Sequence, residues 1–262
     1  MANLMNGKRG LVMGVANERS IAWGIAKALA AEGAELAFSY QGDAFGKRVQ
    51  PLAASLGSEF LVDVDVTSDD SLDAAFAALK DRWGQIDFLV HAIAYSDKNE
   101  LTGRFTNTSR DNFKNSLDIS CYSFIDVSRR AAELMPEGGS LITLTYGGSN
   151  RVTPFYNVMG VAKAALEASV RYLANDLGPQ KVRVNAISPG PMKTLAGAAI
   201  GGARKTYRHT EANAPLGHNA TLEAVGGAAV FLASDYGACT TGDIVMVDSG
   251  YHVLGMPQPD NI

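Results

Sequence analysis

Cysteine and histidine are scarce in this sequence, and their scarcity excludes several kinds of site. The two cysteines, Cys121 and Cys239, lie far apart and form no CxxC pair, and the four histidines match neither HExxH nor another zinc pattern. We therefore expect no disulfide framework and no metal site. The GxSxG elbow of serine hydrolases is also absent, so a hydrolase has no support.

Long apolar runs and an excess of basic charge are lacking too. No stretch reaches the ~18 uninterrupted apolar residues that a membrane helix needs, and the start, MANLMNGKRG, has no apolar run of signal-peptide length. The net charge of −4 gives no overall basic field for nucleic acid or an anionic membrane surface. We expect a cytoplasmic protein that binds no nucleic acid and does not insert into a membrane.

The sequence does contain a regular alternation of short apolar runs with segments of helical period. Apolar residues on successive positions are typical of strands covered on both faces. Strands that alternate with helices predict parallel βαβ units with right-handed crossovers. The expected fold over residues 1–262 is therefore α/β: a single-domain, Rossmann-type doubly wound parallel sheet of about seven strands with helices on both faces.

The strands expected from the apolar runs span 9–15, 35–40, 59–64, 86–94, 140–145, 182–187 and 244–247. The helices expected between them span 21–31, 44–56, 71–83, 112–134 and 154–177, with one or two more between 197 and 233. The stretch SPGPMKTLAGAAIGGARK, from Ser188, breaks this rhythm with prolines, glycines and alanines. It predicts a long, mobile excursion, and we expect a flexible substrate-binding segment at about 192–212. The last residues, GMPQPDNI, are expected to lie irregularly on the surface.

The first expected strand leads into a loop that fits a dinucleotide pyrophosphate. In GLVMGVANERSIAWG, Gly14 follows the strand, and Ser20 precedes a helix. Glycine lets the backbone approach a phosphate oxygen closely, and a helix N-terminus offers unpaired N–H groups. We expect Ser20 to cap the helix and to donate to a phosphate. The strict GxGxxG pattern is absent, so an ordinary strand-to-helix turn is the alternative.

The end of the second strand, FSYQGD, bears on the choice of cofactor. Dinucleotide folds read the adenosine ribose near this point, and NADP proteins place a basic residue there. Here Gln41 occupies the tip and Asp43 follows, whereas Lys47 and Arg48 come later, within an expected helix. The sequence favours NAD(H) and leaves NADPH open as a second donor.

Two tyrosines and a lysine stand in TYGGSNRVTPFYNVMGVAK, from Thr145 to Lys163. Thr153-Pro154 is typical of a helix start, so Tyr156 and Lys163 are expected on one helix, about 20° apart in direction and about 10 Å apart along the axis. That spacing suits two groups that address different parts of one cofactor. Tyr146 follows a strand at the carboxyl edge of the sheet, where such folds bind ligands. The alternative is a core tyrosine and a solvated lysine.

Four segments together resemble a known family: Gly14-x5-Ser20-Ile21-Ala22, DISCYSF from Asp118, Tyr156-x6-Lys163, and VRVNAISPGPMKTLA from Val182. They are similar to the NADH-dependent enoyl-acyl-carrier-protein reductases of bacterial type II fatty acid synthesis, a divergent branch of the short-chain dehydrogenase/reductases. The x6 spacing is the most specific element, because ordinary members of the larger family have Tyr-x3-Lys. The resemblance spans nearly the whole chain.

The resemblance implies reduction of a trans-2-enoyl thioester by hydride transfer from NADH to the β-carbon. Tyr156 is then the hydrogen-bond donor to the enolate, Lys163 orients the nicotinamide ribose, and Tyr146 orients the substrate or assists proton delivery. The cofactor contacts implied are Gly14, Ser20, Ile21, Gln41, Asp65, Val66, Ala94, Lys163 and Thr194, with Asp65 and Val66 at the adenine and Thr194 at the pyrophosphate. The substrate contacts expected are Tyr95, Tyr146, Tyr156, Met159, Leu195, Ala196 and Ile200.

The resemblance also implies partners. Acyl carrier protein delivers the enoyl chain, and Arg204, Lys205 and Arg208 form a local basic patch that either docks this acidic partner or is only a solvated helix face. Family members are commonly homotetramers packed through the helices expected at 112–134 and 154–177. Ala94, Ala203 and Cys121 depart from residues common in the family, which bears on pocket shape and acyl-chain preference.

Two other functions remain as alternatives. A short-chain β-ketoacyl or alcohol reductase shares the cofactor and the tyrosine, but the x6 spacing and Tyr146 oppose it. A non-catalytic dinucleotide-sensing protein would use the same fold without needing catalytic residues. The presence of both tyrosines and Lys163 argues against this function.

Overall fold

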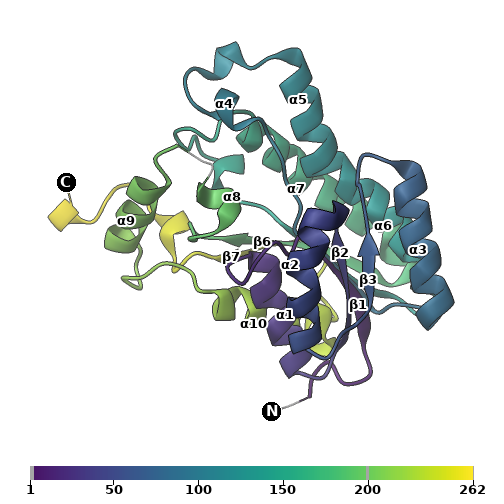
Figure 1. The fold of residues 1–262 in the computed structure, drawn as a ribbon. Helices are drawn as coiled ribbons and strands as arrows, with labels where there is room; N and C mark the ends of the chain where they lie inside the picture. The colour runs from purple at the N-terminus through teal and green to yellow at the C-terminus, as the bar shows by residue number, and fades with distance from the viewer. Residues whose placement is uncertain (1–2, 199–200, 262) are drawn as a thin grey trace.

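The computed structural model describes residues 3–198 and 201–261 of the chain (Figure 1). Seven parallel strands form one sheet in the order β3-β2-β1-β4-β5-β6-β7. The strands are β1 (Arg9–Met13), β2 (Glu35–Tyr40), β3 (Leu61–Asp63), β4 (Phe88–His91), β5 (Gly139–Leu144), β6 (Val182–Pro189) and β7 (Ile244–Val247). The predicted doubly wound sheet is confirmed, although β3 and β4 are shorter than the apolar runs that predicted them.

Helices cover both faces of the sheet (Figure 1). They are α1 (Ile21–Ala31), α2 (Gly42–Ser55), α3 (Asp69–Trp83), α4 (Lys98–Leu101), α5 (Arg110–Leu117), α6 (Ser123–Glu133), α7 (Val158–Leu177), α8 (Leu195–Ala198), α9 (Ala203–Asn213) and α10 (Leu222–Ala233). Buried residues of α1, α2 and α10 pack with one face, and those of α3, α6 and α7 pack with the other. The core therefore has two layers with the sheet between them.

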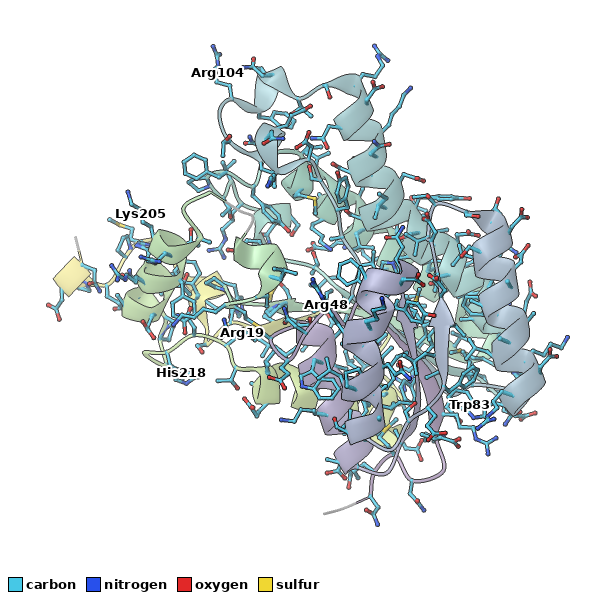
Figure 2. The ribbon with its side chains drawn as sticks, in the orientation of Figure 1. Arg19, Arg48, Trp83, Arg104, Lys205 and His218 are labelled. Atoms are coloured by element: carbon cyan, nitrogen blue, oxygen red, sulfur yellow. The ribbon has the colours of Figure 1, made fainter. Side chains whose placement is uncertain are left out.

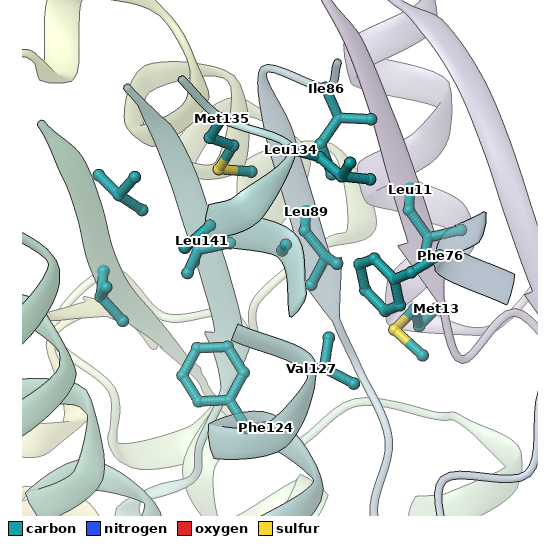
Figure 3. Packing of buried hydrophobic residues seen from close by; sticks show 14 of the residues in the cluster. Leu11, Met13, Phe76, Ile86, Leu89, Phe124, Val127, Leu134, Met135 and Leu141 are labelled. Carbon is teal, nitrogen blue, oxygen red and sulfur yellow. The ribbon is translucent and has the colours of Figure 1, made fainter. Parts of the chain in front are cut away.

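The alternation of side chains along each strand divides the core between these layers. Leu11 and Met13 of β1 pack on the α3 and α6 side, where Phe76 lies beside them and Phe124 belongs to the same cluster (Figure 3). Val12, between them in sequence, packs on the α1 and α10 side. Because both faces are covered, strands such as β4 (FLVH) and β7 (IVMV) appear in the sequence as nearly continuous apolar runs. Full burial of such a side chain contributes about 1.5–3 kcal/mol, which holds the sheet as a firm base for the loops at its edge.

The strand order reverses between β1 and β4, and ligands of such sheets bind outside the carboxyl ends of the strands at this point. Gly14 lies there with φ +98°, and a Cβ at this position would stand 2.1 Å from the carbonyl oxygen of Ala92, just after β4. Two strand ends therefore meet so closely that a side chain has no room. The geometry alone requires glycine here.

Two predicted helices differ from the structure. The segment expected at 112–134 is α5 and α6 joined by a five-residue π-helix, Asp118–Tyr122. The helix expected from Pro154 begins instead at Val158, because Phe155 (φ 63°) and Asn157 (φ 41°) have left-handed backbone that no α-helix accepts. Thr153-Pro154 therefore does not start α7, and the prediction that Tyr156 and Lys163 share one helix is wrong.

The segment after β6 is more regular than predicted, because it contains α8 and α9. Ile200 lies outside the described residues. Near the C-terminus, Gln258 donates its backbone N–H to the Asn213 side chain at 2.8 Å, and a short 3-10 helix, Pro259–Asn261, follows. Over 3–198 and 201–261, no helix has both the length and the apolar character needed to cross a bilayer, and no cluster of His, Cys, Asp and Glu is arranged to hold a metal ion.

Candidate active site

The loop after β1 is organised by Ser20. Its Oγ accepts hydrogen bonds from the backbone N–H groups of Ala16 (3.0 Å) and Asn17 (3.1 Å), and the residue is buried. Ser20 is at the N-cap of α1, but its side chain does not cap the helix, which corrects that expectation. Within the described chain, the N–H groups of Ile21 and Ala22 find no acceptor. They remain free to bind an anion at the helix N-terminus.

Thr194 lies on the other side of this loop. Its Oγ1 accepts the N–H of Gly197 at 2.9 Å, at the start of α8. A hollow of about 250 Å³ joins it to the β1–α1 loop, and its lining includes Arg19, which Figure 2 labels. The hollow is lined by Arg19, Met192, Lys193, Thr194, Tyr207, Ala220, Thr221 and Leu222. Two positively charged residues, Arg19 and Lys193, therefore lie beside the loop that is predicted to hold phosphate.

The residues predicted to contact adenosine follow β2 and β3. Gln41 is exposed, Val66 is half-buried, and Asp65 accepts from the Thr67 hydroxyl at 2.7 Å. Hydrogen bonds from the Thr67 side chain and backbone, and from Gln41, lower the pKa of the Asp65 carboxyl. The structure therefore brings Gln41 and Asp65 together. Four strand spacings separate the end of β3 from that of β5, about 19 Å, so this group does not touch Tyr156.

The two tyrosines are in direct contact. The rings of Tyr146 and Tyr156 lie edge to face, with centroids 5.1 Å apart and an interplanar angle of 68°. Tyr156 is buried with Leu101, Val158 and Met159, and Tyr146 packs against this cluster. A Cβ at Gly148 would lie 2.4 Å from the Tyr156 ring, so the chain at Gly148 defines one wall for that ring.

Burial raises the pKa of both tyrosines. The Tyr156 pKa rises well above its ordinary value, chiefly through burial, with smaller contributions from the neighbouring Tyr146 and Glu167. The Tyr146 pKa rises for the same main reason. Both phenols are therefore neutral near pH 7 and available as hydrogen-bond donors.

Lys163 is buried on α7, which excludes the solvated lysine of the alternative interpretation. Its Nζ donates to the carbonyl oxygen of Leu144 at 2.7 Å, at the end of β5. Burial lowers the pKa of Lys163 to about 8, while Cys121 and Glu167 act in the opposite direction. The side chain is mainly an ammonium ion at pH 7. An ammonium group has three donors, so two remain for a ligand.

Of the remaining residues predicted to contact cofactor or substrate, some lie near the tyrosine pair and others do not. Ala94 and Tyr95 are exposed, and the Tyr95 backbone exchanges hydrogen bonds of 3.0 and 3.1 Å with the Ser120 hydroxyl, which lies 3.8 Å from the Met159 sulfur. Met159 therefore adjoins the tyrosine pair, and the Tyr95 backbone is connected to Met159 through Ser120. Leu195 is exposed. The Ala196 side chain, like Ile200, falls outside the part of the structure that is described.

Sequence reasoning missed a buried polar network beside Lys163. His91, at the end of β4, is fully buried, with Nε2 2.8 Å from the Ser123 hydroxyl and Nδ1 3.3 Å from the Thr143 hydroxyl. Burial, followed by the charge of Lys163, lowers the pKa of His91 to about 3, so the imidazole is neutral. Thr145 similarly donates to Glu167 at 2.6 Å. A histidine within the apolar run FLVHAIA is the signal that marks this network.

The sequence pattern of the enoyl-(acyl carrier protein) reductase family matches residues 14–252, from Gly14 after β1 to beyond β7. The chain belongs to this family. It is 61% identical over 257 residues to enoyl-[acyl-carrier-protein] reductase [NADH] 2 of Rhizobium meliloti, covering 98% of this chain and 96% of that protein. The resemblance stated from the motifs is confirmed.

Solved structures of the family have the same fold. The reductase of Candidatus Liberibacter asiaticus superposes with a TM-score of 0.97 at 52% identity, covering 98% of this chain and 100% of that one. The reductase of Anaplasma phagocytophilum, solved in complex with NAD, gives a TM-score of 0.95 at 55% identity and covers 97% of each chain.

Proposed function

We propose that Tyr156, Tyr146 and Lys163 carry out the reduction of the trans-2 double bond of enoyl thioesters with NADH, the last step of the fatty acid elongation cycle. The activity is that of the family. The observation that supports this assignment is the contact between the rings of Tyr146 and Tyr156. Tyr146 follows Leu144 by two residues, and the carbonyl oxygen of Leu144 accepts a hydrogen bond from Lys163.

The residues at the point where the strand order reverses, between β1 and β4, fit a dinucleotide. Gly14 has no side chain between the ends of β1 and β4. The backbone N–H groups of Ile21 and Ala22 have no acceptor within the described chain. Because Ser20 Oγ accepts two backbone N–H groups, its own hydrogen remains free to donate to a phosphate oxygen. Thr194 serves the pyrophosphate, Gln41, Asp65 and Val66 serve adenosine, and Ala94 lies beside the cofactor.

NADH, when bound, supplies the hydride that reaches the β-carbon of the substrate. Negative charge then develops on the thioester oxygen, and the neutral Tyr156 phenol donates a hydrogen bond that strengthens as the charge grows. Lys163 holds ribose hydroxyl groups with its free donors and adds positive potential. Tyr146 orients the thioester through its contact with Tyr156. The substrate chain is proposed to contact Tyr95, Met159, Leu195, Ala196 and Ile200, with α8 and α9 of the segment 192–212 covering it.

The function is tested by comparing two thioesters of equal chain length. NADH oxidation is expected with a trans-2-enoyl substrate, at a kcat/KM more than about 100-fold above that for a 3-ketoacyl substrate. The reverse preference identifies a β-ketoacyl reductase. Tight NADH binding without turnover of either substrate identifies a dinucleotide sensor.

Acyl carrier protein is the proposed partner, docking on the N-terminal half of α9. Arg204, Lys205 and Arg208 are exposed there, and Figure 2 shows Lys205 projecting outward. Arg204 and Arg208 are four residues apart and so share one face of the helix. A basic patch on a chain whose net charge is −4 steers an acidic partner to α9.

Charge reversal at Arg204→Glu with Arg208→Glu is expected to lower kcat/KM for enoyl-carrier protein about 10- to 100-fold, mainly through KM. A short enoyl thioester without the carrier keeps its wild-type kcat/KM. The matched control reverses Lys80 and Arg82 at the far end of α3, which leaves both substrates unaffected. Equal losses with and without the carrier contradict docking at α9.

The proposal also includes a cytoplasmic homotetramer. A hollow of about 380 Å³ lies between α6 and α7, and its lining combines apolar with charged and polar side chains: Ile125, Arg129, Ala132, Glu133, Leu173, Asp176, Leu177 and Gln180. Tyr172 of α7 is 80% exposed, and tyrosine is enriched at protein–protein interfaces. Both features favour packing of copies through these helices.

A further inference from the structure

The turn that carries Tyr156 has an unusual backbone. Phe155 has φ 63° and Asn157 has φ 41° with ψ −122°, and Tyr156 lies between them. Non-glycine residues adopt such conformations rarely, and they persist only where surrounding contacts impose them. The contacts that impose this turn therefore also determine where the Tyr156 phenol lies.

Asn157 supplies contacts of this kind. Its Nδ2 lies 3.1 Å from the carbonyl oxygen of Leu101 and 3.4 Å from those of Glu100 and Gly103. Three acceptors surround one nitrogen, so the donor end of the amide must face them. A carboxylate of the same shape would put oxygen against oxygen and would repel all three.

The segment that Asn157 contacts is itself anchored. The Glu100 carboxylate accepts from the N–H and hydroxyl of Ser109 at 2.8 Å each, and from Asn112 Nδ2 at 3.3 Å, which ties α4 to α5. The Leu101 side chain belongs to the same buried cluster as Tyr156. The α4 segment therefore contacts the turn at two places, the amide of Asn157 and the ring of Tyr156.

The opposite side of the turn faces the proposed substrate segment. A Cβ at Gly201 would lie 3.1 Å from the Phe155 ring, and one at Gly202 would lie 3.3 Å from it. The turn is thus enclosed between the α4 segment and the start of α9. Tyr156 has little freedom as long as both contacts persist.

We propose that Asn157 is a positioning residue for Tyr156, whose carboxamide holds the turn against the α4 segment so that the phenol hydroxyl meets the thioester oxygen. This inference rests on the proposed function. It assigns to Asn157 no contact with substrate or cofactor, and it predicts that Asn157 acts on kcat through Tyr156 alone.

Two substitutions test separate parts of this role. Asn157→Asp keeps the shape and removes the donor, and Asn157→Gly removes the side chain while accepting the positive φ. Both are expected to lower kcat about 10- to 100-fold, because a displacement of about 1 Å at a reacting group has an effect of this size. The Kd for NADH stays within about twofold of wild type, because Lys163 and the Gly14 loop are unchanged. Asn150→Asp, at an exposed position nearby, is the charge-matched control and keeps the wild-type kcat.

A double-mutant cycle separates positioning from a general structural effect. In the Tyr156→Phe background, Asn157→Asp and Asn157→Gly are expected to cost less than about threefold in kcat, because the hydroxyl that they displace is already gone. Multiplicative losses, a wild-type kcat in Asn157→Gly, or a parallel loss of NADH affinity would each overturn the inference. Thermal unfolding checks folding, and Asn157→Gly carries the test if Asn157→Asp does not fold. A wild-type enzyme inactive on enoyl thioesters refutes the proposed function instead.

Discussion

Tyr156→Phe is expected to lower kcat for an enoyl thioester about 100- to 1,000-fold, the range for loss of a hydrogen-bond donor to a developing oxyanion. The phenyl ring still fills the place between Tyr146, Leu101 and Met159, so packing is retained. Stopped-flow measurement of NADH oxidation gives the rate, and isothermal titration gives the NADH Kd, which stays within about twofold of wild type.

Two controls accompany this variant. Tyr236→Phe removes the same atom from a tyrosine that is 73% exposed and lies in the 3-10 helix Asp235–Gly237, and it is expected to leave kcat unchanged. Tyr146→Phe is expected to slow turnover less than Tyr156→Phe, because the role proposed for Tyr146 is to orient the substrate and the role proposed for Tyr156 is to donate to the oxyanion. If Tyr156→Phe keeps the wild-type kcat, the phenol is not the donor.

Lys163→Met is expected to weaken NADH binding about 10- to 100-fold, the equivalent of about 1.5–3 kcal/mol for a lost hydrogen bond to a charged group. Methionine keeps most of the buried volume next to Leu144 and removes the ammonium ion. Fluorescence titration with NADH measures the change. An unchanged Kd would contradict the assignment of Lys163 to the cofactor.

The pH dependence of NADH binding follows from the lowered pKa of Lys163. Its pKa in the free protein is about 8, so the cation is present below that pH and is lost as the pH rises through it. The NADH affinity of the wild type is therefore constant near pH 7 and falls above pH 8, by at most about tenfold per pH unit. Lys163→Met is expected to lack this fall. The groups that face Lys163 are His91, Cys121 and Glu167.

The fold was predictable because a doubly wound sheet leaves a clear mark in the sequence. Strands buried on both faces appear as continuous apolar runs, and Gly14 marks the place where β1 meets the chain after β4. The ends of the shorter strands were less predictable. The apolar run that contains β4 continues past His91, although the ladder stops there.

The candidate site residues stay a prediction, and the geometry of the turn that carries Tyr156 could not be predicted from the sequence. Thr153-Pro154 has the composition of a helix start, yet contacts from Asn157 to a segment more than fifty residues earlier force the chain into a turn. Such tertiary contacts leave no local pattern. Burial of Lys163 was equally hidden, because lysine is usually solvated and its partner is a backbone carbonyl.

The proposed roles of Tyr156 and Lys163 are tested most directly by a crystal structure of the protein with NAD and an unreactive enoyl thioester analogue, in which two distances are measured. Tyr156 Oη is expected about 2.6–3.2 Å from the thioester oxygen, and Lys163 Nζ is expected within the same range of a nicotinamide ribose hydroxyl. A Tyr156 hydroxyl directed away from the thioester, or a Lys163 that keeps only its bond to Leu144, would contradict these roles.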